Sequence, residues 1–256
     1  MDDPLRLTVL GSATPYPAVD NPCSGYLLTG GGARIWVDAG TGTLAQLQRH
    51  VGPGELDAIW ISHLHADHTA DLLTAYYGLR YADIRLEAPI PLYGPPGTAD
   101  RLAHFLTNGP DRSPVESVFA VEELHDGHVA GVGGLTLTAR AVAHGIPAFA
   151  LRVADAAGRS LVYSGDTAPC AALTDLASGC DVLLCEADCA EPERDRVHHT
   201  PEDAGDTARA AGAARLVVTH LGRALTPASA VARAAERFGG PVAYAAPGAV
   251  FQVGAA

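Results

Sequence analysis

Short apolar runs recur along the chain, and each ends at a polar or glycine-rich turn. Each holds four to six residues that are mostly Val, Ile and Leu, a length and composition typical of buried strands rather than helices. The predicted strands are LTVLGS at 7–12, ARIWVDAG at 33–40, LDAIWISH at 56–63, SLVYSGD at 160–166, DVLLCEA at 181–187 and RLVVTH at 215–220.

Helical patterns lie between these runs. The predicted helices are Thr43–Val51, Thr69–Leu79, Thr98–Leu106, Pro201–Ala211 and Pro227–Phe238. Thr200 and Thr226 each stand directly before a proline, in the position of a helix N-cap. The middle of the chain, from Phe119 to Val153, has the pattern of strands and turns, and the loosely composed stretch from Asn108 to Ser117 predicts a surface loop.

Strands in both halves with helices between them predict an α/β fold, a sandwich of sheets covered on its outer faces by helices. No low-complexity tract or long linker divides the sequence, so we expect residues 1–256 to form one domain. No apolar run approaches the roughly 18 to 20 residues that a membrane-spanning helix needs, and the N-terminus lacks a basic segment before an apolar stretch. These features predict a soluble, cytoplasmic protein.

The chain is acidic, with a formal net charge of −12, and its 17 basic residues are scattered. Sequence-independent binding of nucleic acid depends on many clustered cations, so we expect no stable nucleic-acid partner. A small phosphate ester stays open as a substrate, because a metal pair can supply positive charge locally.

The five cysteines are few, odd in number and without CxxC spacing, which predicts cytosolic thiols rather than disulfides. Cys180, Cys185 and Cys189 could in principle hold a metal. Cys185 lies in the apolar run VLLC, however, which favours a buried thiol.

The segment His63-Leu64-His65-Ala66-Asp67-His68 carries four candidate metal ligands directly after a predicted strand. His63 and His65 are two residues apart and point the same way, whereas Asp67 and His68 follow through the turn and can address a second position. A solvated polar turn is the alternative, but packing and capping give no reason for three histidines there. Histidine and aspartate together favour zinc, manganese or iron over calcium or magnesium.

Three predicted strands end in such residues: IWISH in His63, LVYSGD in Asp166 and LVVTH in His220. Side chains carried by the ends of different strands can converge at one edge of a sheet. This pattern predicts a shared site.

The segment HLHADH resembles the HxHxDH signature of the metallo-β-lactamase superfamily, and the resemblance continues through His144 in ARAVAHGIP, Asp166 in VYSGDT and His220 in LVVTHL. It implies an αββα sandwich and two divalent metal ions, zinc in the first place with manganese or iron as alternatives. By that resemblance, one metal is bound by His63, His65 and His144, the other by Asp67, His68 and His220, and Asp166 bridges them. Cys170 could replace Asp166 as a ligand, but the position of Asp166 at a strand end favours Asp166.

Such a metal pair activates water and stabilises charge, which suits hydrolysis of phosphodiesters, esters or lactones. The resemblance implies that Asp67 orients or deprotonates this water. The segment His198-His199-Thr200 is similar to a His-Ser/Thr element of ribonuclease Z, and we assign its general-acid role to His199, which directly precedes Thr200. The alternative is that His199 only packs near the next helix. The remaining histidines, which no motif supports, are expected at the surface or in loops: His50, His104, His125 and His128.

The segments VLGSATPYPAVDNPCSGYLL, WVDAG, VYSGDT, DVLLCEA and HHTPEDAG resemble ribonuclease Z and the related cyclic-nucleotide phosphodiesterases. Ribonuclease Z carries an RNA-gripping arm between the third His and the bridging Asp, but here only 21 residues separate His144 from Asp166. Two predicted strands, AFALRVA and SLVYSG, fill that interval.

We therefore expect a binuclear phosphodiesterase for a small substrate, most of all a cyclic nucleotide of the 3′,5′-cyclic AMP type. The alternatives are a tRNA 3′-processing endonuclease, a lactone or ester hydrolase of a biosynthetic pathway, and a non-catalytic binding module. The loops Pro15–Ser24 and Tyr76–Tyr81 flank the motif and are the expected pocket walls. The sequence leaves open whether the chain forms a homodimer.

Overall fold

Two seven-stranded sheets form the centre of the molecule in the computed structural model, which describes residues 3–82, 84–105 and 110–254. The first sheet has, in spatial order, β14 (Val250–Gln252), β1 (Arg6–Gly11), β2 (Gly25–Gly30), β3 (Ala33–Val37), β4 (Ala58–Trp60), β5 (Ile90–Gly94) and β6 (Phe119–Glu123). The second has β13 (Val242–Tyr244), β12 (Leu216–Leu221), β11 (Val182–Ala187), β10 (Ser160–Tyr163), β9 (Phe149–Asp155), β8 (Leu135–Ala141) and β7 (Val129–Val132).

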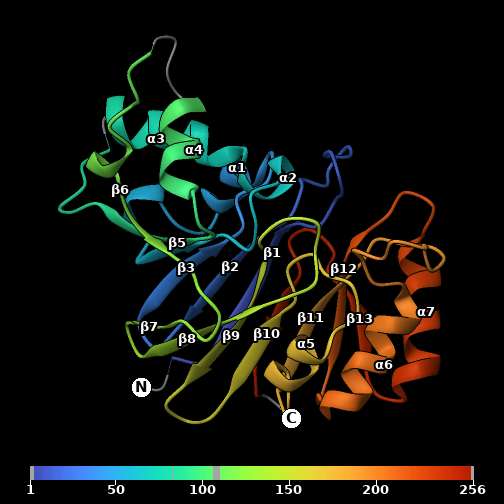
Figure 1. Ribbon diagram of the computed structural model, residues 1–256. Helices are drawn as coiled ribbons and strands as arrows, with labels where there is room; N and C mark the ends of the chain where they lie inside the picture. Colours follow the sequence, from blue (N-terminus) through green and yellow to red (C-terminus); the bar gives the residue numbers. More distant parts are fainter. Residues whose placement is uncertain (1–2, 83, 106–109, 255–256) are drawn as a thin grey trace.

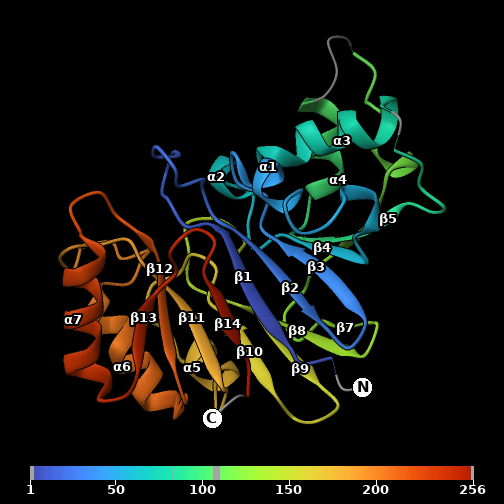
Figure 2. The same ribbon diagram turned by 180° about the vertical axis from the view of Figure 1, so that it is seen from behind.

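Helices cover the outer face of each sheet (Figure 1). The first sheet carries α1 (Thr43–Leu47), α2 (Ala66–Thr69), α3 (Asp71–Tyr81), α4 (Thr98–Phe105) and the 3₁₀ turns Pro53–Glu55 and Val115–Ser117. The second carries α5 (Ala171–Leu176), α6 (Pro201–Ala211) and α7 (Pro227–Phe238). Seen from behind in Figure 2, both termini lie at the end of the sandwich opposite α2. None of the helices in the described ranges is long and apolar enough to cross a membrane.

Three apolar clusters hold these layers together, as expected for sheets that are buried on both faces. The cluster between the sheets joins Tyr26 and Trp60 of the first sheet to Tyr163 of the second. One outer cluster packs Trp36 under the α1, α3 and α4 helices, and the other packs α5, α6 and α7 on the second sheet. The αββα sandwich expected from the sequence is therefore confirmed.

The six predicted strands and five predicted helices are present, and the ends of most of them are shifted. Helices α6 and α7 have the predicted bounds, and the Oγ1 atoms of Thr200 and Thr226 accept hydrogen bonds from the backbone N–H groups three residues later. Helix α1 ends four residues early, at Leu47. The prediction for α4 reached Leu106, which lies outside the described residues, as does part of the predicted loop Asn108–Ser117.

Strands β9 and β10 are antiparallel neighbours joined by a short turn after Asp155, with Asp155 N–H bonded to the carbonyl of Arg159. This hairpin occupies the interval between His144 and Asp166, as the sequence predicted. An inserted arm has no place in it.

Helices α6 and α7 pack closely at Gly205, and this contact makes a test of the fold. Alanine usually stabilises a helix interior relative to glycine by about 0.5–1 kcal/mol. At Gly205, however, an added Cβ would lie 2.4 Å from the carbonyl oxygen of Ala234. We predict that Gly205→Ala lowers the free energy of unfolding by about 1–3 kcal/mol in urea denaturation, because the helices must separate.

Gly78→Ala in α3 is the matched control. An added Cβ there meets only Ile84 Cδ1, at 3.9 Å, so this variant should be at least as stable as the native chain. Stabilisation by both substitutions would contradict the close packing of α6 on α7.

Candidate metal centre

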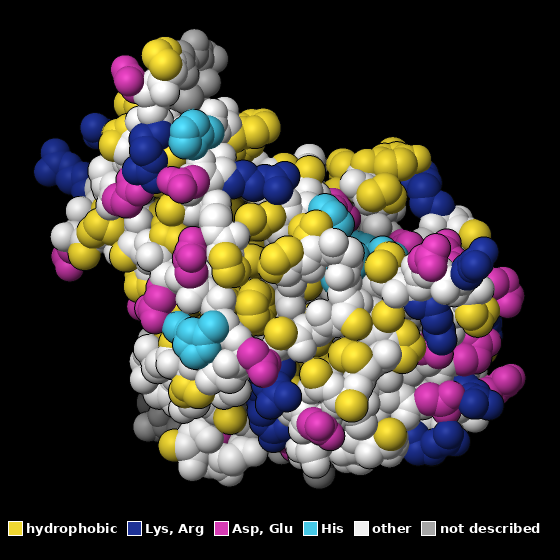
Figure 3. All heavy atoms as spheres, viewed as in Figure 1, with side chains coloured by type: hydrophobic (Ala, Val, Ile, Leu, Met, Phe, Trp, Pro, Cys, Tyr) yellow, Lys and Arg dark blue, Asp and Glu magenta, His cyan; other side chains and the backbone are white. Residues whose placement is uncertain are grey.

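The seven residues predicted as ligands come together at one end of the sandwich, on loops and strand ends of both sheets. His63, His65, Asp67 and His68 follow β4 and enter α2. The other three belong to the second sheet, namely His144 between β8 and β9, Asp166 after β10 and His220 in β12. Figure 3 shows histidine side chains in a recess where the two halves of the molecule meet.

The first group contains His63, His65, His144 and Asp166, with candidate ligand atoms all within 4.8 Å of one another. His65 Nδ1 lies 3.0 Å from His63 Nε2 and 3.3 Å from His144 Nε2. Nitrogens bonded at 2.0–2.1 Å to a tetrahedral zinc ion lie about 3.3–3.4 Å apart. The spacing of the three imidazoles therefore fits a shared metal ion.

The second group contains Asp67, His68 and His220. The Nε2 atoms of His68 and His220 are 3.3 Å apart, and Asp67 Oδ2 lies 3.3 Å from His220 Nε2. His220 has a φ of 49°, a left-handed conformation that is uncommon for residues other than glycine. It coincides with a shift in the β11–β12 register, and the distortion turns the imidazole toward the other ligands.

Asp166 lies between the two groups. One of its carboxylate oxygens is 3.6 Å from His63 Nε2 and 3.5 Å from His220 Nε2, and the other is 3.4 Å from His68 Nε2. This position suits a carboxylate that bridges two ions.

Three of the ring nitrogens that point away from the centre have partners of their own, whereas His220 Nδ1 has none within the described part of the chain. His68 Nδ1 lies 2.7 Å from Asp38 Oδ2, and His144 Nδ1 donates to the carbonyl of Val197 at 3.1 Å. His63 Nδ1 lies 3.1 Å from the Ser62 hydroxyl. Partners of this kind fix the tautomer, so that the Nε2 lone pair faces the centre.

The buried carboxylate and imidazoles of the centre shift one another's pKa values. Burial alone would raise the pKa of Asp166, but His220, His68 and His63 outweigh it and hold the pKa well below its usual range. Burial lowers the pKa of His63, so its imidazole is a neutral ligand. Asp166 Oδ1 is buried without a hydrogen-bond partner among the described residues. The imidazole and carboxylate donors of the centre suit zinc, manganese or iron.

His198, rather than His199, faces the centre. Its ring lies 5.2 Å from that of His144 and 5.9 Å from that of His220, and its Nδ1 is 2.8 Å from Glu186 Oε1. The carboxylate of Glu186 is fully buried below it. From the sequence, His198 was named within the segment His198-His199-Thr200 but His199 was chosen for the acid role, and Glu186 was given no role.

The placement of His199 differs from the expectation. Its side chain is fully buried, with Nδ1 donating to the carbonyl of Thr167 at 2.6 Å and Nε2 3.2 Å from the Thr207 hydroxyl. Burial also lowers its pKa. Both ring nitrogens are engaged in hydrogen bonds that join α6 to the β10–α5 loop. A packing role, the alternative given above, therefore describes His199 better than the role of a general acid.

The remaining candidates lie away from the centre. His50, His104 and His125 are exposed, as expected, but His128 is buried beside the ring of Tyr93. Within the described ranges no cysteine belongs to a group with the spacing of metal ligands, and Cys170 contacts Thr167 instead.

A model of the beta-lactamase superfamily domain matches residues 33–221, a span that includes all seven predicted ligands. A ribonuclease Z of Mycolicibacterium gilvum is 32% identical over 257 residues, covering 87% of this chain and 86% of the relative. An uncharacterised protein of Mycobacterium leprae is 36% identical over 253 residues, covering 97% and 89%. The chain belongs to the metallo-β-lactamase superfamily, in its ribonuclease Z-like branch, and is a metal-dependent hydrolase.

A solved structure shares the whole architecture. The metallo-beta-lactamase fold protein YhfI from Bacillus subtilis superimposes with a TM-score of 0.85 at 26% identity, covering 98% of this chain and 99% of that one. The sandwich and its helical layers are thus those of the superfamily.

Asp38 makes a test of how the outer partners support the ligands. We predict that Asp38→Asn lowers metal affinity about 10- to 100-fold, because an amide offers one acceptor fewer beside His68. Chelator competition measures the affinity, and metal analysis of the native chain should give about two ions.

Asp57→Asn is the control. Asp57 accepts from the backbone and guanidinium of Arg34 and touches no predicted ligand, so metal affinity should not change. An equal effect of both variants would assign Asp38 to general stability alone.

Proposed function

We propose that the chain is a binuclear metal-dependent phosphodiesterase that hydrolyses a small phosphodiester, with a cyclic nucleotide of the 3′,5′-cyclic AMP type as its preferred substrate. The observation that carries the proposal is the position of Asp166 between two groups of ligands. Both sheets contribute to each group, so the proposal treats residues 1–256 as one catalytic domain.

The residues of the proposed centre divide the work of binding. One ion is assigned to the group of His63, the other to the group of His68, and Asp166 is shared; zinc is the ion we favour. When bound, the pair supplies Lewis acidity that activates water and neutralises charge on a phosphoryl group. We assign to Asp67, whose Oδ2 lies 3.3 Å from His220 Nε2, the role of orienting the water.

We transfer the general-acid role from His199 to His198. Burial lowers the pKa of His198, but its hydrogen bond to Glu186 and the charge of that carboxylate outweigh burial and raise the pKa to about 9. The imidazolium can therefore hold a proton beside the centre, while Glu186 fixes the orientation of the ring. A leaving alkoxide needs such a proton.

The compact β9–β10 connection supports a small substrate. A long RNA needs contacts away from the metals, whereas a cyclic nucleotide presents its phosphate in one compact unit. The predicted wall Pro15–Ser24 supports this reading, because Ala18 and Asn21 line a cavity of about 220 Å³ together with residues that follow His220. Processing of precursor tRNA is the second candidate, since a ribonuclease Z is among the relatives.

His198→Ala separates protonation from metal binding. We predict unchanged metal content and a fall in turnover of roughly two to four orders of magnitude on a nucleotide ester, whose alkoxide leaving group needs a proton. The fall should be much smaller on bis(p-nitrophenyl) phosphate, whose leaving group needs little help. Steady-state kinetics on both substrates measures the difference.

His199→Ala is the companion variant. It removes a buried hydrogen-bonded ring, so thermal stability should fall and any loss of turnover should be equal on the two substrates. If His199→Ala, and not His198→Ala, shows the dependence on leaving group, the transfer of the acid role is wrong.

The substrate is tested with one metal-loaded preparation assayed on 3′,5′-cyclic AMP, 2′,3′-cyclic AMP, a precursor tRNA and a panel of lactones. We predict that cyclic nucleotides are opened to nucleoside monophosphates and that precursor tRNA is processed poorly. Efficient cleavage at the tRNA 3′ end with intact cyclic nucleotides would favour the second candidate. Turnover of lactones alone would refute the phosphodiesterase.

A further inference from the structure

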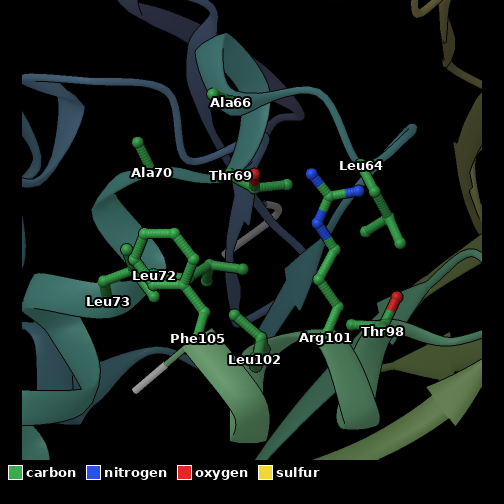
Figure 4. A pocket seen from close by; sticks show the side chains of 10 residues that line it. All are labelled: Leu64, Ala66, Thr69, Ala70, Leu72, Leu73, Thr98, Arg101, Leu102 and Phe105. Carbon is green, nitrogen blue, oxygen red and sulfur yellow. The ribbon is translucent and has the colours of Figure 1, made fainter. Parts of the chain in front are cut away.

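A largely apolar cavity of about 90 Å³ lies directly beside the metal-binding loop. Leu64 and Ala66, the neighbours of His65 in the sequence, form one wall, and Leu72, Leu102 and Phe105 contribute to the others. Figure 4 shows that these side chains come from the loop before α2, from the start of α3 and from α4. One wall of the cavity therefore belongs to the segment that carries four predicted ligands.

The polar side chains that line the cavity differ in whether their hydrogen-bond donors are free to bind a ligand. The hydroxyl of Thr69 donates to the carbonyl of His65 at 2.9 Å, and that of Thr98 donates to the carbonyl of Pro95 at 2.6 Å. Both donors are therefore used within the protein. Arg101 is different, because its guanidinium makes no ion pair with any residue of the described ranges.

Arg101 also extends toward the loop that carries the predicted ligands. In Figure 4 its side chain extends from α4 toward Leu64 and Thr69. Arg223, three residues after His220, differs from Arg101 because its guanidinium lies over the ring of Tyr16, 4.2 Å from the ring centroid. In a chain with a net charge of −12, an exposed arginine that lines an apolar cavity and has no ion pair within the described ranges suits an anion with an apolar substituent.

Phe105 adds a second sign of a ligand. Its side chain lines the cavity yet is 70% exposed, which leaves a large aromatic surface in contact with water. A planar group entering the cavity would cover that ring. Aromatic side chains gain from such stacking beyond the area they bury.

We propose that this cavity is the subsite for the aromatic substituent of the substrate, a base in the case of a nucleotide, and that Arg101 binds an oxygen of the same substrate's phosphoryl group. The inference rests on the proposed function, because the phosphoryl group is taken to lie at the metal centre. The proposed selectivity is for a substrate that carries an aromatic ring beside its phosphoryl group.

The test measures binding of phenyl phosphate and methyl phosphate to the metal-loaded protein by calorimetry. The native chain should bind phenyl phosphate about 10-fold more tightly, the low end of what burial of a ring gives, because the cavity is open. Phe105→Ala should bring this ratio near one and leave methyl phosphate unaffected. Arg101→Ala should weaken both ligands about 10-fold, and Arg101→Lys should restore part of the loss.

Arg80→Ala is the matched control, since Arg80 is an exposed arginine on α3 that does not line the cavity. Its binding should equal that of the native chain. Equal affinity of the native chain for both phosphates would overturn the subsite, and equal effects of Arg101→Ala and Arg80→Ala would overturn the role of Arg101. Because these monoester probes contain no diester bond and report binding alone, an inactive protein that still prefers phenyl phosphate would refute only the phosphodiesterase, and an active one without the preference would refute only the subsite.

Discussion

The buried carboxylate of Asp38 is the group on which both the sandwich and the metal centre depend. It accepts hydrogen bonds from the backbone and hydroxyl of Ser62 after β4, and from the hydroxyl of Tyr163 in the opposite sheet. The fourth partner is His68. Burial of a charged carboxylate costs free energy unless hydrogen-bond donors surround it. This network therefore holds Asp38 and its donors firmly in place. The sheets and the predicted ligands are therefore held by the same few bonds.

The features predicted from sequence are those that local pattern determines. Apolar runs of strand length predicted the sandwich. Residues of the kinds that bind metals, at the ends of three strands, predicted that His63, Asp166 and His220 converge. Threonine before proline gave the starts of α6 and α7. Each of these signals lies within a few residues, and tertiary packing did not override it.

The features that were missed depend on contacts distant in sequence. Successive side chains of an extended segment point to opposite sides, and nothing near His198 and His199 tells which side faces the centre. Glu186 decides it from β11, as Tyr163 gives Asp38 its role from 125 residues away. Strands β2 and β5 were not predicted because neither has a long apolar run. Strand β2 begins and ends with glycine, and Pro91 interrupts β5.

The division of ligands between the sheets has a consequence for the life of the protein in a cell. Each proposed ion draws histidines from both halves of the sandwich, so bound metal acts as a clamp that exists only in the folded chain. By mass action, free metal at 100 times its dissociation constant adds about 2.7 kcal/mol to the stability of such a protein. Metal scarcity would then shorten its lifetime as well as silence it, because opened molecules are what proteases degrade.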